Sequence, residues 1–280
     1  MTSHATPFEP VPAALPAYPR PQRVTQTRVL RSEWTKLRTL PSALWTLLSA
    51  VVLVIGFGVL YSLLREARPP QGAAAIRSFD PVAISLSGVQ LAQIAVGVLG
   101  VLVITSEYAT GLIRTSLAAV PGRLPMLWGK AATLAAATIA VSLPAVFAAV
   151  VAGQSILGRR HLAAPLGQPD LTRAILGSAL YLALAALLGL GLGTLLRSTA
   201  GGISALFGLL FGVQIAAGLL PGHWAQEVAK YLPAAAGQAV TTIHPDPAYS
   251  LPPWAGLGVF CLYPAVLLGL AALRLRRGDA

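Results

Sequence analysis

The residue types that most often carry out chemistry in proteins are sparse in this chain. No HExxH metal motif and no GxxxxGK[ST] phosphate loop occurs in the sequence. The four histidines lie outside the long apolar runs: His4, His161, His223 and His244. The single cysteine, Cys261, excludes an intramolecular disulfide and a cysteine-based metal site. The sequence therefore predicts no enzyme activity, no bound cofactor and no nucleotide hydrolysis by this chain itself.

Ionisable side chains are nearly absent from the apolar runs, and this argues against an ion-coupled carrier. Such carriers need charged groups within the hydrocarbon to bind the coupling ion. Glu107 is the acid closest to an apolar run, and it lies at the end of that run, where we expect its carboxylate to reach water. If the protein transports a substrate, we expect the energy to come from another subunit.

One polar segment combines residue types that suit the binding of a protein partner. It reads TSEYATGLIRTSLAAVPGR from Thr105 to Arg123 and contains an acid, an aromatic and a glycine. A short helix over residues 111–119 would present apolar side chains to a groove on a soluble partner. Pro121 would end that helix. The alternative interpretation is a solvated turn with scattered polar residues.

The composition predicts that the segments around these residues cross a membrane. The chain has 280 residues, of which 55% are hydrophobic and 10% charged, and its mean hydropathy is +0.71. The apolar residues fall in long uninterrupted runs, whereas a water-soluble protein scatters them at helix or strand period. The formal net charge is +11, but the basic residues lie between the apolar runs, so we expect no nucleic-acid partner.

The chain divides into a tail and one transmembrane domain. Residues 1–24 are rich in proline and are predicted to be a disordered cytoplasmic tail without the apolar core of a cleavable signal peptide. The domain, 25–280, is predicted to be all-α and polytopic, with six helices of the length that a bilayer requires. The six expected spans lie near residues 42–64, 82–105, 124–152, 174–196, 201–220 and 254–273.

Local signals support two of the helix starts. Pro41 suits the first turn of the first span, and Asp80 before Pro81 predicts an N-cap followed by a first-turn proline. In the polar stretch before the last span, Trp224, Val228 and Leu232 recur at helical spacing. We expect short helices there at the membrane interface, anchored by aromatic side chains.

Residues 24–40 predict a basic amphipathic helix on the membrane surface. The expected apolar face is Val29, Leu30, Trp34, Leu37 and Leu40. Trp34 suits the headgroup level, and Arg31 and Lys36 suit the anionic lipid of a cytoplasmic leaflet. The alternative is an ordinary solvated helix.

The distribution of basic residues predicts the orientation. With six spans, 13 of the 20 Lys and Arg residues fall on the side shared by the two termini and 7 on the other. Both termini are therefore expected to be cytoplasmic in a cell membrane. The pair Arg159 and Arg160 falls on the opposite side and is the weak point of this prediction.

Two pairs of glycines stand four residues apart, Gly189 with Gly193 and Gly208 with Gly212. Small residues at this spacing allow two membrane helices to approach closely. The pairs therefore indicate helix packing, either within the protein or across a dimer. The alternative is that glycine is simply frequent in membrane helices.

The EYATGLIRTSLAAVPGR run resembles the permease subunits of ABC-2 type ABC transporters, particularly short actinobacterial permeases with a similar EYATG.IRT...A.P.R pattern. The resemblance extends over the whole chain and includes the RSEWTKLRT segment before the first span. It departs from the family at Gly122, where related chains often carry a basic residue.

The resemblance implies that residues 24–40 form an elbow helix and that a coupling helix between spans two and three contacts a separate ATP-binding subunit. By position, the coupling residues would be Glu107, Tyr108, Gly111, Ile113 and Arg114. It implies an exporter in which a second permease copy completes the pathway, with ATP bound by the partner subunit. The stretch before the last span would form re-entrant helices. The alternative function is a non-transporting scaffold or sensor that anchors a cytoplasmic partner.

Overall fold

The computed structural model describes residues 26–72, 75–76, 79–109, 123–165, 169–219, 224–243 and 250–277. All regular secondary structure in these ranges is helical, and six helices are long and apolar enough to cross a membrane. The protein is therefore of the multi-pass membrane class that the composition predicts. Within the expected coupling segment, residues 110–122 lie outside the described ranges, and so do residues 1–25, which include the whole predicted tail.

The first half of the chain contains α1 (Gln26–Thr39), α2 (Pro41–Ala67), α4 (Pro81–Ser85), α5 (Val89–Ala109) and α7 (Arg123–Gly158). The second half contains α8 (Pro169–Leu196), α9 (Thr199–Phe207), the π-helical turn η1 (Gly208–Gly212), α10 (Val213–Gly218), α11 (Trp224–Ala229), α12 (Pro233–Gln238), the 3₁₀ turn η2 (Ala239–Thr241) and α13 (Pro253–Arg277).

Both local start signals are confirmed. Pro41 begins α2, and the Asp80 carboxylate accepts hydrogen bonds from the backbone amides of Val82 and Ala83 at 3.0 and 2.8 Å. The second expected span, however, is not continuous from residue 82. It turns after α4 at residues 86–88 and restarts as α5. Gly88 in this turn packs closely against α2, since an added Cβ would lie only 2.3 Å from the carbonyl oxygen of Leu53.

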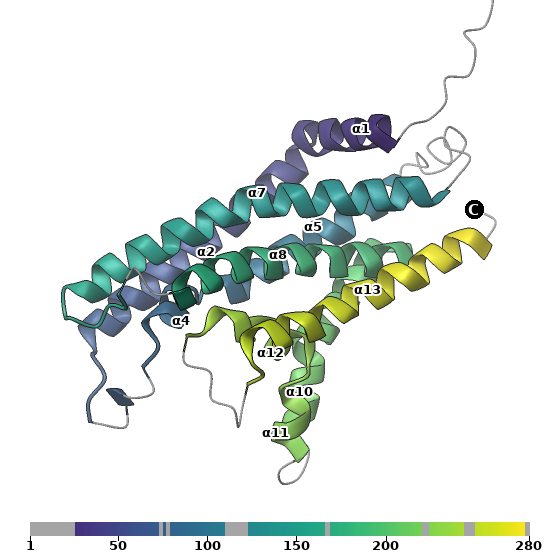
Figure 1. The fold of residues 1–280 in the computed structure, drawn as a ribbon. Helices are drawn as coiled ribbons and strands as arrows, with labels where there is room; N and C mark the ends of the chain where they lie inside the picture. Colours follow the sequence, from purple (N-terminus) through teal and green to yellow (C-terminus); the bar gives the residue numbers. More distant parts are fainter. Residues whose placement is uncertain are drawn as a thin grey trace, which may run out of the picture.

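The core of the bundle is formed by α5 and α8, with α2 and α7 on one side and α13 on the other (Figure 1). α7 is the longest helix, with 36 residues, and it extends past the expected end at residue 152. At 1.5 Å per residue it is about 54 Å long. Because the hydrocarbon core of a bilayer is about 30 Å thick, α7 is longer than a span requires.

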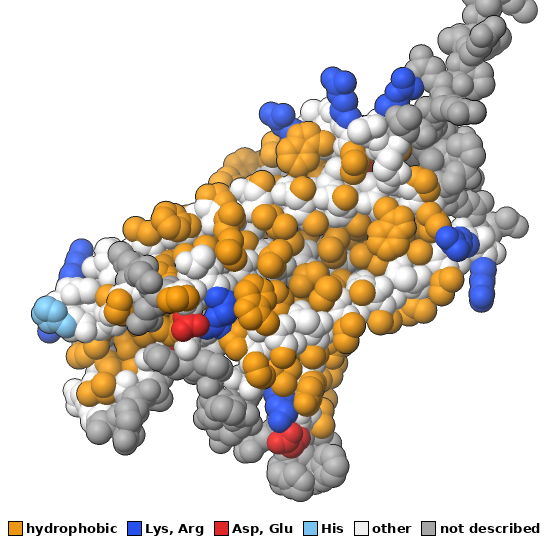
Figure 2. All heavy atoms as spheres, viewed as in Figure 1, with side chains coloured by type: hydrophobic (Ala, Val, Ile, Leu, Met, Phe, Trp, Pro, Cys, Tyr) orange, Lys and Arg blue, Asp and Glu red, His pale blue; other side chains and the backbone are white. Residues whose placement is uncertain are grey.

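The two ends of the bundle differ in the segments they carry. One end, called here the α1 end, holds α1, the last turn of α5, the first turns of α7 and the basic last turn of α13 (Figure 1). At the opposite end Arg159 lies 3.9 Å from Glu66, so the 159–160 pair is on the far side from α1. Figure 2 shows a broad hydrophobic face with lysine and arginine side chains over α1 and at the end of α13.

The expected short helices before the last span are present as α11, α12 and η2. α12 and η2 lie inside the bundle, because Pro233, Ala236 and Val240 are buried and Gly237 lies against the ring of Tyr181. Tyr231 and Trp254 are exposed, at 50% and 56%. α10 and α11 extend away from α7 and α8 (Figure 1).

Candidate functional site

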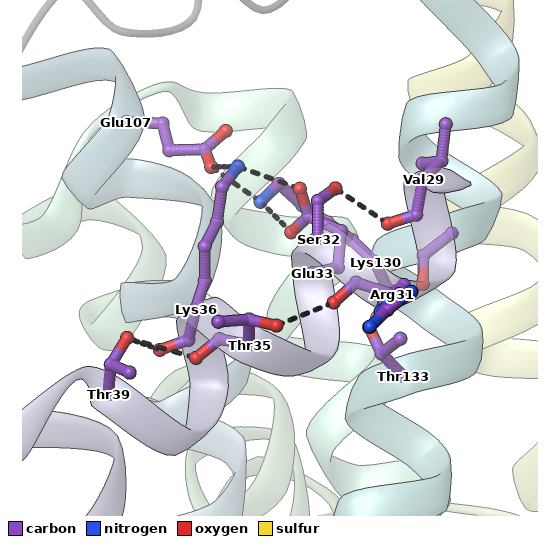
Figure 3. A network of polar contacts seen from close by, with 11 residues as sticks. Val29, Arg31, Ser32, Glu33, Thr35, Lys36, Thr39, Glu107, Lys130 and Thr133 are labelled. Atoms are coloured by element: carbon purple, nitrogen blue, oxygen red, sulfur yellow. Dashed lines mark hydrogen bonds and ion pairs between the residues drawn. The ribbon is translucent and has the colours of Figure 1, made fainter. Parts of the chain in front are cut away.

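Four charged side chains from three helices form a closed ring of ion pairs at the α1 end, called here the charge ring: Glu33 and Lys36 of α1, Glu107 of α5 and Lys130 of α7 (Figure 3). The Lys130 Nζ lies 2.6 Å from Glu33 Oε2 and 2.7 Å from Glu107 Oε1. The Lys36 Nζ lies 2.7 Å from Glu33 Oε1 and 3.0 Å from Glu107 Oε1.

Three members of the charge ring are buried, and the fourth, Lys36, is partly exposed. The exposed fractions of the side chains are 2% for Lys130, 6% for Glu33 and 9% for Glu107, but 43% for Lys36. Two carboxylates and two ammonium groups leave the ring neutral. A buried charge is tolerated only when it is paired, and removing one partner from such a pair destabilises a protein strongly. The ring therefore ties α1, α5 and α7 together, and its three buried members are the ones that cannot be lost singly.

α1 is positioned on α7 by contacts that follow one stripe of the helix. Val29, Glu33 and Leu37, four residues apart, are its buried residues. Val29 fits against Gly129, where an added Cβ would lie 2.8 Å from the Val29 Cγ1. Glu33 follows one turn later and meets Lys130. The helix therefore rests on α7 through the Val29 contact and the Glu33–Lys130 ion pair, and Leu37 is buried one turn further on.

The placement of α1 on the membrane surface stays a prediction. Trp34, Leu40 and Arg31 are exposed, whereas the face of α1 that packs on the protein is Val29, Glu33 and Leu37. Lys36 does not point to solvent alone, since its ammonium group binds both carboxylates of the ring. Burial by itself would lower the pKa of Lys36, but the hydrogen bonds and charges of Glu33 and Glu107 outweigh it and raise the pKa above 10.5.

The prediction that Glu107 reaches water is also wrong. Glu107 is buried, and its partners lie 71 and 23 residues away in the sequence. Lys130 was missed as an ionisable residue within an apolar run, although it lies in the first turns of α7. The signal was present in the sequence, because a lysine inside a predicted span implies a carboxylate partner.

The residue after Glu107 connects α5 to the other side of the bundle. The guanidinium of Arg197 lies 5.6 Å from the centre of the Tyr108 ring, within the range of a cation–π contact. Arg197 occupies the α8–α9 turn in the left-handed region, at φ 53°. Such a conformation is unfavourable for a residue with a Cβ, so surrounding contacts must hold it. Thr199 donates a hydrogen bond to Thr105 of α5 at 2.9 Å in the same turn.

The last turn of α5 therefore makes two divergent sets of contacts. Glu107 binds α1 and α7, and Tyr108 contacts the α8–α9 turn, which Arg274 of α13 also reaches by donating a hydrogen bond to the Leu195 carbonyl. Gly111, Ile113 and Arg114, the other residues of the predicted coupling set, lie outside the described residues.

The two glycine pairs occupy different surroundings. A Cβ at Gly189 would lie 1.9 Å from the Gly97 carbonyl oxygen, and one at Gly193 would lie 2.7 Å from the Ile104 Cγ2, so this pair faces α5. A Cβ at Gly208 or Gly212 would meet nothing within 4 Å. The second pair lies at the two ends of the π-helical turn η1.

Among the described residues, no group of three or more His, Cys, Asp or Glu side chains could hold a metal ion. No protein-family model matches the sequence, and a search of curated proteins finds no match. The features available for a functional conclusion are therefore the charge ring, the contacts of Tyr108 and the six apolar helices.

Proposed function

We propose that this chain is the membrane-spanning subunit of an ATP-driven transporter of the ABC-2 type. In this proposal it is an exporter that forms the substrate pathway and couples to a separate ATP-binding subunit. The observation that supports it best is the last turn of α5, because Glu107 and Tyr108 lie near the start of the predicted partner-binding segment and contact α1, α7 and the α8–α9 turn. The lack of a phosphate loop in the sequence is consistent with a motor on another chain.

The contacts suggest how movement would pass from the motor to the spans. A displacement of residues 110–122 by the ATP-binding subunit would pull on the end of α5. Through Glu107 it would act on α1 and α7, and through Tyr108 on the α8–α9 turn. ATP would change the equilibrium between two arrangements of the helices only if the motor binds them with different free energies.

The orientation belongs to the same proposal. The α1 end, which holds α1, the last turn of α5 and the basic end of α13, would face the cytoplasm of the cell. It carries 13 of the 20 basic residues when the tail and the loops are counted with it. This asymmetry follows the rule that lysine and arginine are retained on the cytoplasmic side. α1 would then be the elbow helix at the inner membrane surface.

The proposal includes a second copy of this chain, or a related permease, packed along the fifth span. In the apolar stretch of that span, α9 to α10, 22% of the residues are buried, against 72% in the apolar stretch of α8. Its Gly208 and Gly212 leave space for a close helix neighbour, and the partly exposed Gln214 follows them on α10. A second helix would fill that space and could hydrogen-bond the exposed part of the Gln214 amide.

Charge reversal at Arg114 tests the coupling role. We expect R114E to lose the co-purifying ATP-binding subunit and its coupled ATPase activity, because a charged contact that is lost at an interface costs about 2 to 5 kcal/mol. R160E is the matched control, since Arg160 is an exposed arginine at the opposite end. The measurement is pull-down from detergent followed by ATP hydrolysis in proteoliposomes. If R114E kept both the bound ATP-binding subunit and its coupled ATPase activity at the wild-type level, the coupling assignment would be contradicted.

The same preparation separates transport from a scaffold. A scaffold would retain the bound subunit, while its ATPase activity would be the same with and without the membrane chain. A transporter is expected to change that activity when the chain is reconstituted in lipid.

A further inference from the structure

The turn between α8 and α9 contains an arginine in a backbone conformation that normally selects glycine. Arg197 directly follows α8 with φ 53°, and its backbone amide donates a hydrogen bond to the Gly193 carbonyl at 2.9 Å. Helices often end with a residue in this left-handed region, and that residue is usually glycine because a Cβ is unfavourable there. Arginine at this position costs conformational free energy and does not improve the helix end. The presence of its side chain therefore needs a separate reason.

A second arginine lies close to Arg197, and no acid pairs with either of them. Arg274 of α13 donates a hydrogen bond to the carbonyl of Leu195, two residues before Arg197. Among the residues that the structure describes, neither arginine forms an ion pair. Glu107 on the neighbouring end of α5 is already bound by the two lysines of the charge ring. The two guanidinium groups therefore leave two positive charges uncompensated.

Both guanidinium groups are accessible to a ligand. Arg274 is exposed, and Arg197 is partly exposed. The Arg197 Nε is buried without a hydrogen-bond partner in the described part of the chain, so a ligand would meet the two Nη groups instead. The Tyr108 ring, whose centre lies 5.6 Å from the guanidinium carbon, supports Arg197 from the α5 side. A guanidinium presents its N–H donors in a planar fork that matches the oxygens of a phosphate or carboxylate.

The surface next to the two arginines is apolar, which favours a lipid as the source of the anion. Leu270 precedes Arg274 by one turn of α13 and is 49% exposed, and Leu196, the neighbour of Arg197, is 47% exposed. α8 and α13 are both long and apolar enough to cross a membrane, and the two arginines lie at the ends of these helices. Basic side chains at the end of an apolar span lie at the level of the lipid headgroups.

The uncompensated charge selects the type of headgroup. A zwitterionic lipid would bring an ammonium group towards two guanidinium groups, and like charges repel. A phospholipid with a net negative charge has no such group and balances part of the positive charge. Attraction between basic residues at the membrane surface and anionic lipid acts in the same direction.

We propose that Arg197 and Arg274 bind the phosphate of an anionic phospholipid, such as phosphatidylglycerol. The guanidinium groups donate hydrogen bonds to the phosphate oxygens, and the acyl chains follow the exposed side chains of Leu196 and Leu270. This site does not depend on the transport function, because α8, the α8–α9 turn and α13 of one chain supply all of it.

Native mass spectrometry of the delipidated full-length protein tests the site with two lipids of identical acyl chains. We expect phosphatidylglycerol to bind about tenfold more tightly than phosphatidylcholine. Glycerol phosphate, which has the phosphate without the acyl chains, should bind at least about tenfold more weakly than phosphatidylglycerol. Equal binding of the two lipids would overturn the selectivity for an anionic headgroup. Equal binding of glycerol phosphate would show that the site takes a soluble anion and would also overturn the proposal.

R197G makes the result specific to this turn, because glycine suits the left-handed conformation and only the side chain is removed. We expect R197G to bind one phosphatidylglycerol fewer per chain, with a thermal stability close to that of the wild type. H161G is the matched backbone control, since His161 has φ 58° at the opposite end of the bundle and its lipid count should not change. An unchanged lipid count in R197G would contradict the proposal.

Two substitutions on α13 separate this site from a general effect of positive charge. R274Q lies outside the left-handed turn and should lose the same lipid as R197G. R276Q removes an exposed arginine of the same last turn, and we expect it to keep the lipid. Equal lipid loss in R274Q and R276Q, or retention of the lipid in R274Q, would show that Arg274 does not form a defined site with Arg197.

Discussion

α8 and the fifth span are consecutive apolar helices with glycines at the same spacing, yet they have different surroundings. Their mean hydropathies are 2.2 and 1.8, so composition barely separates them. Gly189 and Gly193 lie against α5, whereas Gly208 and Gly212 meet no atoms within 4 Å of an added Cβ. The spacing of small residues makes close approach possible, but the neighbouring helices decide whether it occurs. The first pair is part of the packed core, and the second leaves an open surface.

The same contrast between packed and open positions applies to the two lysines of the charge ring. It predicts the largest change in the free energy of unfolding. K130M would leave two carboxylates with one half-exposed lysine, and we expect it to lower the free energy of unfolding by about 3 to 5 kcal/mol. K36M removes a 43% exposed partner and should lower it by at most about 1 kcal/mol. Thermal or denaturant unfolding of the purified protein measures both. Equal effects of the two substitutions would show that burial does not decide the contribution of each lysine.

Alanine substitutions at the two glycine pairs test the comparison directly. G189A should destabilise the protein by about 1 to 3 kcal/mol, because its Cβ would meet the Gly97 carbonyl oxygen and α5 would have to move. G208A should be neutral or stabilise the helix by about 0.5 to 1 kcal/mol, since the site is open and alanine favours helix. The midpoint of thermal unfolding is the measurement. The contrast fails if G189A is as stable as the wild type.

A smaller effect is expected for Gln214, which tests the proposed dimer. Q214L should weaken self-association by roughly two- to threefold, the factor of one hydrogen bond of about 0.6 kcal/mol between membrane helices. The fold of the single chain should be unaffected. Q154L is the contrasting variant, because Gln154 donates to the Pro81 carbonyl and accepts from the Ala164 amide within the chain. The measurement is dimer dissociation on dilution in detergent, monitored by energy transfer between labelled copies. It should show weaker association for Q214L and unchanged association for Q154L. Unchanged association of Q214L would remove Gln214 from the dimer contact.

The smallest effect concerns pH. The folded-state pKa of Lys36 is above the ordinary 10.5, so its ion pairs stabilise fully below that value and are lost as pH rises through the higher folded pKa. The stability difference between wild type and K36M should therefore stay constant from about pH 7 to about pH 10 and decrease above that range. Unfolding in denaturant at three pH values checks this. A difference that disappears already near neutral pH would show that Lys36 is not held by the two carboxylates.

Much of the fold follows from local sequence, whereas the candidate site does not. The sequence predicts an amphipathic helix in the α1 segment, and a helix is present, but nothing in its local pattern distinguishes Glu33 from a solvent-exposed acid. Its partner Lys130 is 97 residues away, and local periodicity contains no information about which distant residue a carboxylate meets. Tyr108 was identified only through the resemblance of its segment, and its contact with Arg197 depends on a turn between two other helices.

The sequence by itself determined the six apolar helices and the starts of two of them at Pro41 and Asp80. Apolar length and first-turn capping act within one segment, so each can be read from neighbouring residues. Only the tertiary structure decided that four charges on three helices close into a ring, and that one glycine pair is packed while the other is open. Those outcomes depend on which helices meet and at what distance, and both are set by the packing of the whole bundle.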